Sequence, residues 1–185
     1  MTEKKTFLKQ FLKEKKMVGS IRPSSRFLTK KMLENIDFNY AKVIVELGPG
    51  TGVFTKKIIE KMAEDAILLV FELNDNFFNL LKSSINDKRV ILIHDSAEKI
   101  DEYLKINNLH EADTVISSLP LANFPVELRD SIVSKSHQVL SNSGKFIQFQ
   151  YSIQSKKILK LTYSSVSISF TPLNFPPAFI YTCVK

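Results

Sequence analysis

The sequence predicts an α/β protein built on a doubly wound, mostly parallel seven-stranded sheet with an antiparallel final strand. Two observations support this prediction. Short apolar runs rich in β-branched residues alternate along the chain with segments of helical period. The first four apolar runs are continuous and do not alternate with polar residues, as expected for parallel strands that helices cover on both faces.

The predicted strands and helices alternate regularly along the chain. The first five strands are expected at 41–47, 66–73, 89–95, 113–119 and 144–151. The helices that follow them are expected at 51–64, 74–85, 96–106, 125–140 and 154–161. Two further strand-like runs, 165–170 and 178–184, are joined by the turn-rich segment 171–177, which predicts a hairpin with an antiparallel edge.

At 185 residues the chain is long enough for one domain with a sizeable core. We expect a single domain in which 1–17 form an arm, 18–40 a helical segment and 41–185 the α/β core. The single cysteine, Cys183, cannot form an internal disulfide, which indicates a reducing, cytoplasmic compartment. No apolar run reaches the roughly 18 residues that a membrane span needs.

The arm carries the basic charge of the chain. Residues 1–31 hold ten lysines and arginines against two glutamates, whereas the formal net charge of the whole chain is +7. At helical spacing, one side of the arm is apolar and the other holds lysines, interrupted by Lys15. Such a basic amphipathic helix favours an anionic membrane surface, although the same apolar face could instead pack on the protein's own core.

A glycine-rich stretch, "VIVELGPGTGVFT" at 43–55, follows the first strand and opens a helix. Three of the five glycines in the chain, Gly48, Gly50 and Gly52, fall here at alternate positions. In open α/β sheets this turn is where a ligand approaches the backbone closely. A dinucleotide fingerprint would need a further glycine at Val53, so the spacing argues against NAD.

Two acids stand where the next strands end. Glu72 lies 20 residues beyond Gly52, and a carboxylate there can accept hydrogen bonds from both hydroxyls of a ribose. Asp95 ends the third strand and can accept a hydrogen bond from the exocyclic amine of an adenine. Together with a loop that need not hold a phosphate, these positions indicate an adenosyl compound as the ligand.

The glycine loop, the Glu72 position and "HDSAEKI" together resemble the class I S-adenosylmethionine-dependent methyltransferases, which have a Rossmann-like fold. The resemblance covers about residues 40–185. It implies that S-adenosyl-L-methionine is the cofactor and S-adenosyl-L-homocysteine the product. It also implies that the glycine loop holds the methionine part and that Glu46 helps to position its amino group. The remaining expected contacts from the core are Leu73, Ser96, Ala97 and Ser117.

Three further stretches narrow the resemblance to the bacterial phospholipid N-methyltransferases, which methylate phosphatidylethanolamine. These are "VGSIRPSSRFLTKKM" at 18–32, "SSLPLANFP" at 117–125 and the closing "LNFPPAFIYTCVK". In that family the segment matching Pro23, Ser24 and Ser25 lies over the cofactor. Ser24 is also a plausible helix N-cap. The expected partners are therefore a phospholipid substrate and an anionic membrane surface.

The alternative is the related ribosomal RNA adenine dimethyltransferase family, which would act on nucleic acid. Its members carry an Asn-Leu-Pro-Tyr type motif, whose aromatic ring stacks on the flipped base. Here that place is taken by Ser118–Leu119–Pro120–Leu121. Leu121 cannot stack as an aromatic ring does, although Phe124 lies nearby. That family also usually has a C-terminal helical domain, so we expect a lipid rather than RNA as substrate.

Methyl transfer to an amine requires alignment and a dry site more than further chemical groups. The histidines show no ligand spacing, and we expect no metal. Tyr151 is a candidate for orienting the amine or helping to remove its proton through water. Ser117 and Ser118 are candidates for accepting a hydrogen bond from the amine. A non-catalytic protein that only binds S-adenosylmethionine is a further alternative.

Overall fold

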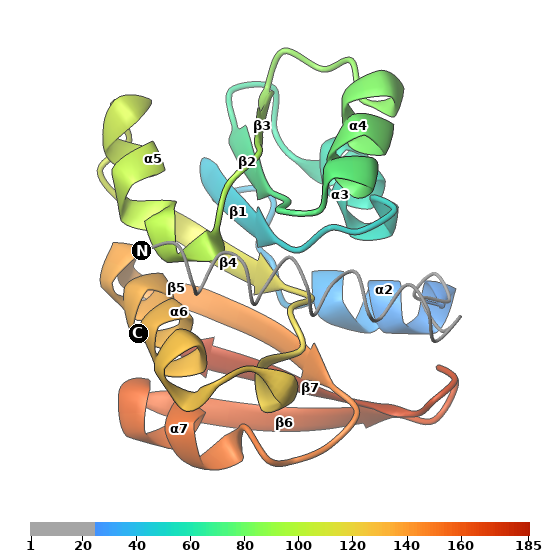
Figure 1. Ribbon diagram of the computed structural model, residues 1–185, viewed down its shortest axis with the longest axis vertical. Coiled ribbons are helices and arrows are strands. Elements are labelled where there is room, and N and C mark those ends of the chain that lie inside the picture. The colour runs from blue at the N-terminus through green and yellow to red at the C-terminus, as the bar shows by residue number, and fades with distance from the viewer. Residues whose placement is uncertain (1–24) are drawn as a thin grey trace.

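The computed structural model describes residues 25–185, which form a central sheet with helices on both faces (Figure 1). The arm at 1–17 and the part of the helical segment before Ser25 lie outside the described residues. The strands are β1 (Val43–Leu47), β2 (Ile67–Phe71), β3 (Val90–Ile93), β4 (Ala112–Ser117), β5 (Leu140–Gln150), β6 (Ser165–Thr171) and β7 (Ala178–Val184). The helices are α2 (Arg26–Leu33), α3 (Val53–Lys61), α4 (Asp75–Ser84), α5 (Ile100–Ile106), α6 (Val126–Val139) and α7 (Lys156–Thr162), with short 3₁₀ turns η1 (Ala97–Lys99) and η2 (Leu121–Asn123).

The seven strands form one sheet in the order β3-β2-β1-β4-β5-β7-β6. The pairings among β1 to β5 are parallel, and β7 is antiparallel to both β5 and β6. This confirms the predicted mostly parallel sheet with an antiparallel final strand. The predicted hairpin forms this edge of the sheet, with β7 next to β5 and β6 outermost.

Each face of the sheet packs against its own set of helices. On one face, α2, α3 and α4 bury side chains such as Leu28, Ile58 and Leu81 against the strands. On the other face, α5, α6 and α7 contribute side chains such as Ile132 and Leu159. The inner strands are buried on both faces, which explains their continuous apolar sequences.

The observed boundaries differ from the predicted ones mainly where the chain turns. β5 begins at Leu140, four residues before its predicted start, and its register with β4 shifts there. The segment 96–106 is divided into the 3₁₀ turn η1, which the Ser96 side chain caps, and the helix α5. Within residues 25–185, no helix is both long and apolar enough to cross a bilayer.

Helix α2 is tied to the distant β6–β7 loop. Ser25 is the N-cap of α2, and its hydroxyl accepts a hydrogen bond from the Leu28 N–H, so the proposed cap at Ser24 was one residue early. The backbone N–H of Ser25 donates to the side-chain oxygen of Asn174 at 3.1 Å. The Asn174 amide in turn donates to the Pro176 carbonyl at 2.7 Å. The first described helix and the late hairpin are therefore held together beside the carboxyl ends of the strands.

Candidate active site

The turn after β1 needs its glycines for two different reasons. Gly48, Gly50 and Gly52 all have positive φ, at 70°, 58° and 78°. A Cβ at Gly48 would lie 2.6 Å from the Leu119 side chain, and one at Gly52 would lie 2.7 Å from the Leu81 side chain. A Cβ at Gly50 would meet no described atom within 4 Å. No residue in 25–185 therefore fills the space beside Gly50, so a ligand can approach its backbone closely.

Glu72 fastens this turn to the end of the neighbouring strand. One of its carboxylate oxygens accepts a hydrogen bond from the Gly50 N–H at 3.1 Å, and the other accepts from the Asn74 N–H at 2.7 Å. A carboxylate has about four acceptor positions, so two remain for further donors. Burial raises the pKa of Glu72, and the neighbouring backbone N–H groups oppose this increase. These two remaining positions are where we expect the hydroxyls of a ribose to donate.

Glu46 is a buried acid whose oxygens have no hydrogen-bond partner among the described residues. It lies inside β1 and has no exposed surface. Burial raises its pKa to about 8; the hydroxyl and N–H of the nearby Thr55 lower it in part, although neither meets the geometry of a hydrogen bond, and the charge of Glu72 raises it further. An unpartnered buried acid is costly to a fold, so its presence indicates that a bound group supplies the missing donor. A positively charged amine is such a donor.

The third predicted contact region lies after β3. Asp95 is buried, and its carboxylate accepts from the Ser96 N–H at 2.8 Å and pairs with Lys99 at 2.8 Å. This ion pair was not predicted, and it raises the pKa of Lys99. Leu73 and Ala97 are buried in the core on the side of α5 and α6. Asp95, Ser96 and Ala97 thus lie at the end of β3, next to the end of β2 where Glu72 stands.

The acceptor side of the site is built from the end of β4 and from β5. Ser117 is fully buried, and its hydroxyl accepts from the Leu119 N–H at 3.3 Å. The Ser118 hydroxyl is buried without a partner among the described residues. Two side chains of β5 hold this loop, because Gln148 and Gln150 both donate to the Leu119 carbonyl, at 2.9 and 3.0 Å.

These two glutamines were missed from the sequence. The alternation in "FIQFQ" places them on the same face of β5, which was the available signal. The side-chain oxygen of Gln148 is buried and has no partner among the described residues. It is therefore a second acceptor, besides the Ser118 hydroxyl, close to the loop that follows β4.

Tyr151 follows directly after β5 and is about half exposed. Its ring packs edge-on against Phe149 at 5.7 Å, and Phe149 lies 6.1 Å from Phe54 in the first turn of α3. Burial raises the pKa of the Tyr151 phenol, and the nearby Asn174 side chain lowers it in part. The phenol is therefore protonated at neutral pH, so it can donate a hydrogen bond and is a poor base.

Within the described residues the predicted positions gather at one edge of the sheet, where the parallel strands end. Ser25 is held at this edge by the hydrogen bond from its backbone N–H to Asn174, whereas Ser24 lies outside the described residues. The open space at Gly50, the remaining acceptor positions of Glu72 and the unpartnered acid Glu46 fit an adenosyl compound that carries an amino group. No cluster of three potential metal ligands occurs among residues 25–185.

Comparison with known proteins identifies the class of this fold and site. The sequence profile of the family described as "Ribosomal RNA adenine dimethylase" matches residues 2–162. The chain belongs to this family and is a class I S-adenosylmethionine-dependent methyltransferase. It is therefore an enzyme, with S-adenosylmethionine as its cofactor, and not a protein that only binds this compound.

Its relatives fall into two groups by their names. An ornithine lipid N-methyltransferase from Singulisphaera acidiphila is 32% identical over 96% of this chain and 93% of its own length. Ribosomal RNA small subunit methyltransferase A from Mycoplasmopsis pulmonis is 25% identical over 98% of this chain, which spans only 61% of that enzyme. Among solved structures, a Burkholderia thailandensis 1,6-didemethyltoxoflavin N1-methyltransferase with bound S-adenosylhomocysteine shares the fold, with a TM-score of 0.71 at 11% identity over 98% and 86% of the two chains.

Replacing Gly50 by alanine is expected to harm cofactor binding more than folding. The left-handed backbone costs an alanine about 1–2 kcal/mol, and the new methyl group enters the space that we expect the cofactor to occupy. Gly52→Ala is the control, because its methyl group would meet Leu81 in the core. We expect the larger loss of thermal stability in Gly52→Ala and the larger loss of S-adenosylmethionine affinity, at least tenfold by calorimetry, in Gly50→Ala. The opposite ranking would show that Gly50 is not part of the cofactor site.

Proposed function

We propose that this enzyme is an N-methyltransferase acting on the primary amine of a membrane lipid, with phosphatidylethanolamine as the expected acceptor. We place it in the cytoplasm, peripherally bound to the membrane. The observation that supports a lipid over a nucleic acid is the loop after β4. Leu121 is fully buried and Phe124 is nearly so, which leaves neither side chain available to stack on a flipped base.

The lining of the acceptor side is consistent with this substrate. The partly buried Leu119, which packs against the core that contains Leu121 and Phe124, supplies apolar surface, and the buried acceptors are the Ser118 hydroxyl and the Gln148 side-chain oxygen. An amine donates hydrogen bonds, and these two oxygens lack donors among residues 25–185. The apolar surface excludes water from around the amine. An aminolipid headgroup held close to its acyl chains meets both conditions.

The chemistry divides between the cofactor and the chain. S-adenosylmethionine supplies a methyl group on a sulfonium, which a neutral amine can attack in line. Ser117 and Ser118 would hold the amine by accepting its hydrogen bonds, and Tyr151 would orient it. Since the phenol of Tyr151 is protonated at neutral pH, we assign it a positioning role and infer that the released proton passes to water.

The name of the 32%-identical relative raises ornithine lipid as a second acceptor of the same class. We therefore propose a lipid amine as the substrate class and rank phosphatidylethanolamine and ornithine lipid as the two acceptors to compare.

Transfer of labelled methyl groups tests this proposal. The enzyme is incubated with labelled S-adenosylmethionine and, separately, with phosphatidylethanolamine vesicles, ornithine lipid vesicles and ribosomal RNA. We expect label in at least one lipid, in a methylated amine. Label in N6-methylated adenine, with none in either lipid, would establish instead the ribosomal RNA activity that the family description and the names of the ribosomal RNA methyltransferase relatives favour.

A further inference from the structure

Several large apolar side chains are exposed together around the late hairpin. We call this group the apolar rim: Phe27, Tyr151, Ile153, Leu173 and Phe175. Their exposed fractions range from 39% for Phe27 to 77% for Phe175, with Ile153 at 56% and Leu173 at 60%. Single exposed apolar residues are common, but five around one loop need an explanation.

The loop that carries Leu173 and Phe175 is held from inside. All of 172–177 is exposed except Asn174, whose side chain accepts from Ser25 and donates to Pro176. Three of the six residues in "PLNFPP" are prolines, which further restrict the backbone. The buried Asn174 side chain therefore fixes the position of the loop, and the loop's apolar side chains remain exposed to solvent.

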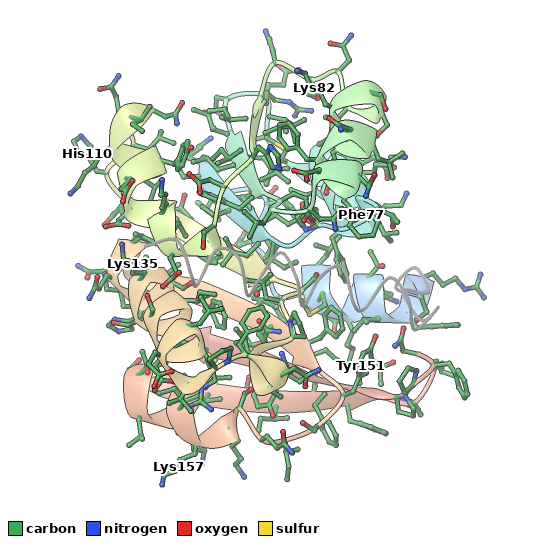
Figure 2. All side chains as sticks on the ribbon, viewed as in Figure 1. Phe77, Lys82, His110, Lys135, Tyr151 and Lys157 are labelled. Carbon is green, nitrogen blue, oxygen red and sulfur yellow. The ribbon has the colours of Figure 1, made fainter. Side chains whose placement is uncertain are left out.

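The apolar rim lies beside the candidate active site. β5 and β6 run in the same direction as β1, so Tyr151 and the loop after β6 emerge at the edge of the sheet where the glycine turn lies. Phe27 belongs to the first turn of α2, directly after the Ser25 that contacts Asn174. Figure 2 shows Tyr151 on the same side of the molecule as Phe77, which lies in the first turn of α4 after Glu72.

The charged residues that neighbour the rim in the sequence are basic. Residues 131–185 contain six lysines and no aspartate or glutamate, whereas 32–130 contain ten basic and seventeen acidic residues. The expectation that the basic charge belongs to the arm alone was therefore wrong. The net charges of 32–130 and 131–185 nearly cancel, so the net charge of 32–185 as a whole did not reveal the difference between the two segments. Lys156 and Lys157, which follow Ile153, are both exposed, and Arg26 stacks on the Phe27 ring at 4.9 Å.

We propose that the apolar rim inserts into the interface of an anionic membrane, with Arg26 and Lys156, the cations nearest to Phe27 and Ile153 in the chain, facing the lipid phosphates. This inference rests on the proposed lipid substrate and adds a docking surface on the folded domain itself. Apolar side chains flanked by cations suit such an interface because burial of apolar surface and attraction to anionic lipid add. The rim's position would bring the acceptor side of the site to the level of the headgroups.

The test compares two double variants that make the same chemical changes. Ile153→Ser with Leu173→Ser alters the rim. Ile106→Ser with Leu161→Ser is the control, because both side chains are exposed, at 69% and 75%. They lie near the ends of the helices that precede β4 and β6, and therefore at the opposite edge of the sheet. Binding is measured by sedimentation with vesicles of phosphatidylglycerol and phosphatidylcholine, and with phosphatidylcholine alone.

We expect the wild type and the control to bind the anionic vesicles and the rim variant to bind at least fivefold more weakly. Methylation of phosphatidylethanolamine dispersed in detergent micelles should stay within about twofold of wild type in both variants. Equal vesicle binding by all three proteins would overturn the proposal. Light scattering gives a second test, because it measures the oligomeric state of each protein. If the rim variant changes its oligomeric state but binds vesicles as the wild type does, the rim joins copies of this chain and the proposal is wrong.

The outcomes separate this inference from the proposed function. If the wild type methylates no lipid in micelles, the lipid substrate fails, and the sedimentation result still decides whether the rim docks on membranes. If methylation in micelles succeeds and the rim variant binds vesicles as the wild type does, only the docking surface fails.

Discussion

Replacing Glu72 by alanine is expected to weaken S-adenosylmethionine binding about 10- to 150-fold. The reason is the loss of charge-assisted hydrogen bonds to the two ribose hydroxyls, which contribute roughly 1.5–3 kcal/mol. Glu72 also holds the backbone N–H groups of Gly50 and Asn74, so the variant should lose some stability as well. Calorimetric titration with S-adenosylmethionine and S-adenosylhomocysteine measures the affinity.

Asp113→Ala is the matched control for this loss of stability. One Asp113 oxygen accepts from the backbone N–H groups of Lys42 and Val43, at 2.8 and 2.9 Å, at the opposite edge of the sheet. Both variants therefore remove a carboxylate that fastens two backbone groups, but only one faces the candidate site. Equal cofactor affinity in Glu72→Ala and Asp113→Ala would contradict the ribose assignment.

The second large effect is a dependence of stability on pH that Glu46 creates. Its pKa is about 8 in the folded protein and about 4.5 in the unfolded chain, so between these values the folded state holds a proton that the unfolded state has lost. The free energy of unfolding should therefore fall as pH rises through this window, by up to about 1.4 kcal/mol per pH unit. Over the whole window the contribution is roughly 3–5 kcal/mol.

Glu46→Gln keeps the shape of the neutral acid and cannot ionise. We expect the difference in free energy of unfolding between the two proteins to shift in favour of the variant from pH 5 to pH 8. Urea unfolding at pH 5, 6, 7 and 8, without cofactor, measures this difference. A difference that stays constant with pH would show that Glu46 does not carry the proton.

The same acid links cofactor binding to proton release. If the amino group of S-adenosylmethionine binds ionised Glu46, the wild-type affinity should rise from pH 6 to pH 8 as the acid becomes easier to ionise. The binding enthalpy should also change with the ionisation enthalpy of the buffer. Neither behaviour is expected in Glu46→Gln, and their persistence there would assign the proton to another group.

Local sequence predicted the elements of the sheet because its strands are short and buried on both faces. The apolar runs around Val45, Leu69 and Val115 have no polar alternation, and the order of strand and helix follows from them. The positions of the glycines, Glu72 and Asp95 at strand ends follow from the same pattern, whereas their roles toward the cofactor remain predictions.

What the sequence did not reveal depends on contacts between distant residues. The contact between Ser25 and Asn174 joins residues 149 positions apart, and no local pattern marks it. The ion pair between Asp95 and Lys99 is local, but only the turn of η1 and α5 brings its charges together. The clamp of Gln148 and Gln150 on Leu119 required knowing that β5 pairs with β4 in that register.

The position of β7 between β5 and β6 has a consequence for synthesis on the ribosome. β6 pairs with no strand except β7 among the described residues, although β6 is made first. β6 therefore has no partner strand until Ala178–Val184 have also been made and have left the exit tunnel. Loss of these seven residues would release two strands from the sheet and not one. A stop codon or a nuclease-derived frameshift shortly before β7 would thus disrupt far more of the domain than its length implies.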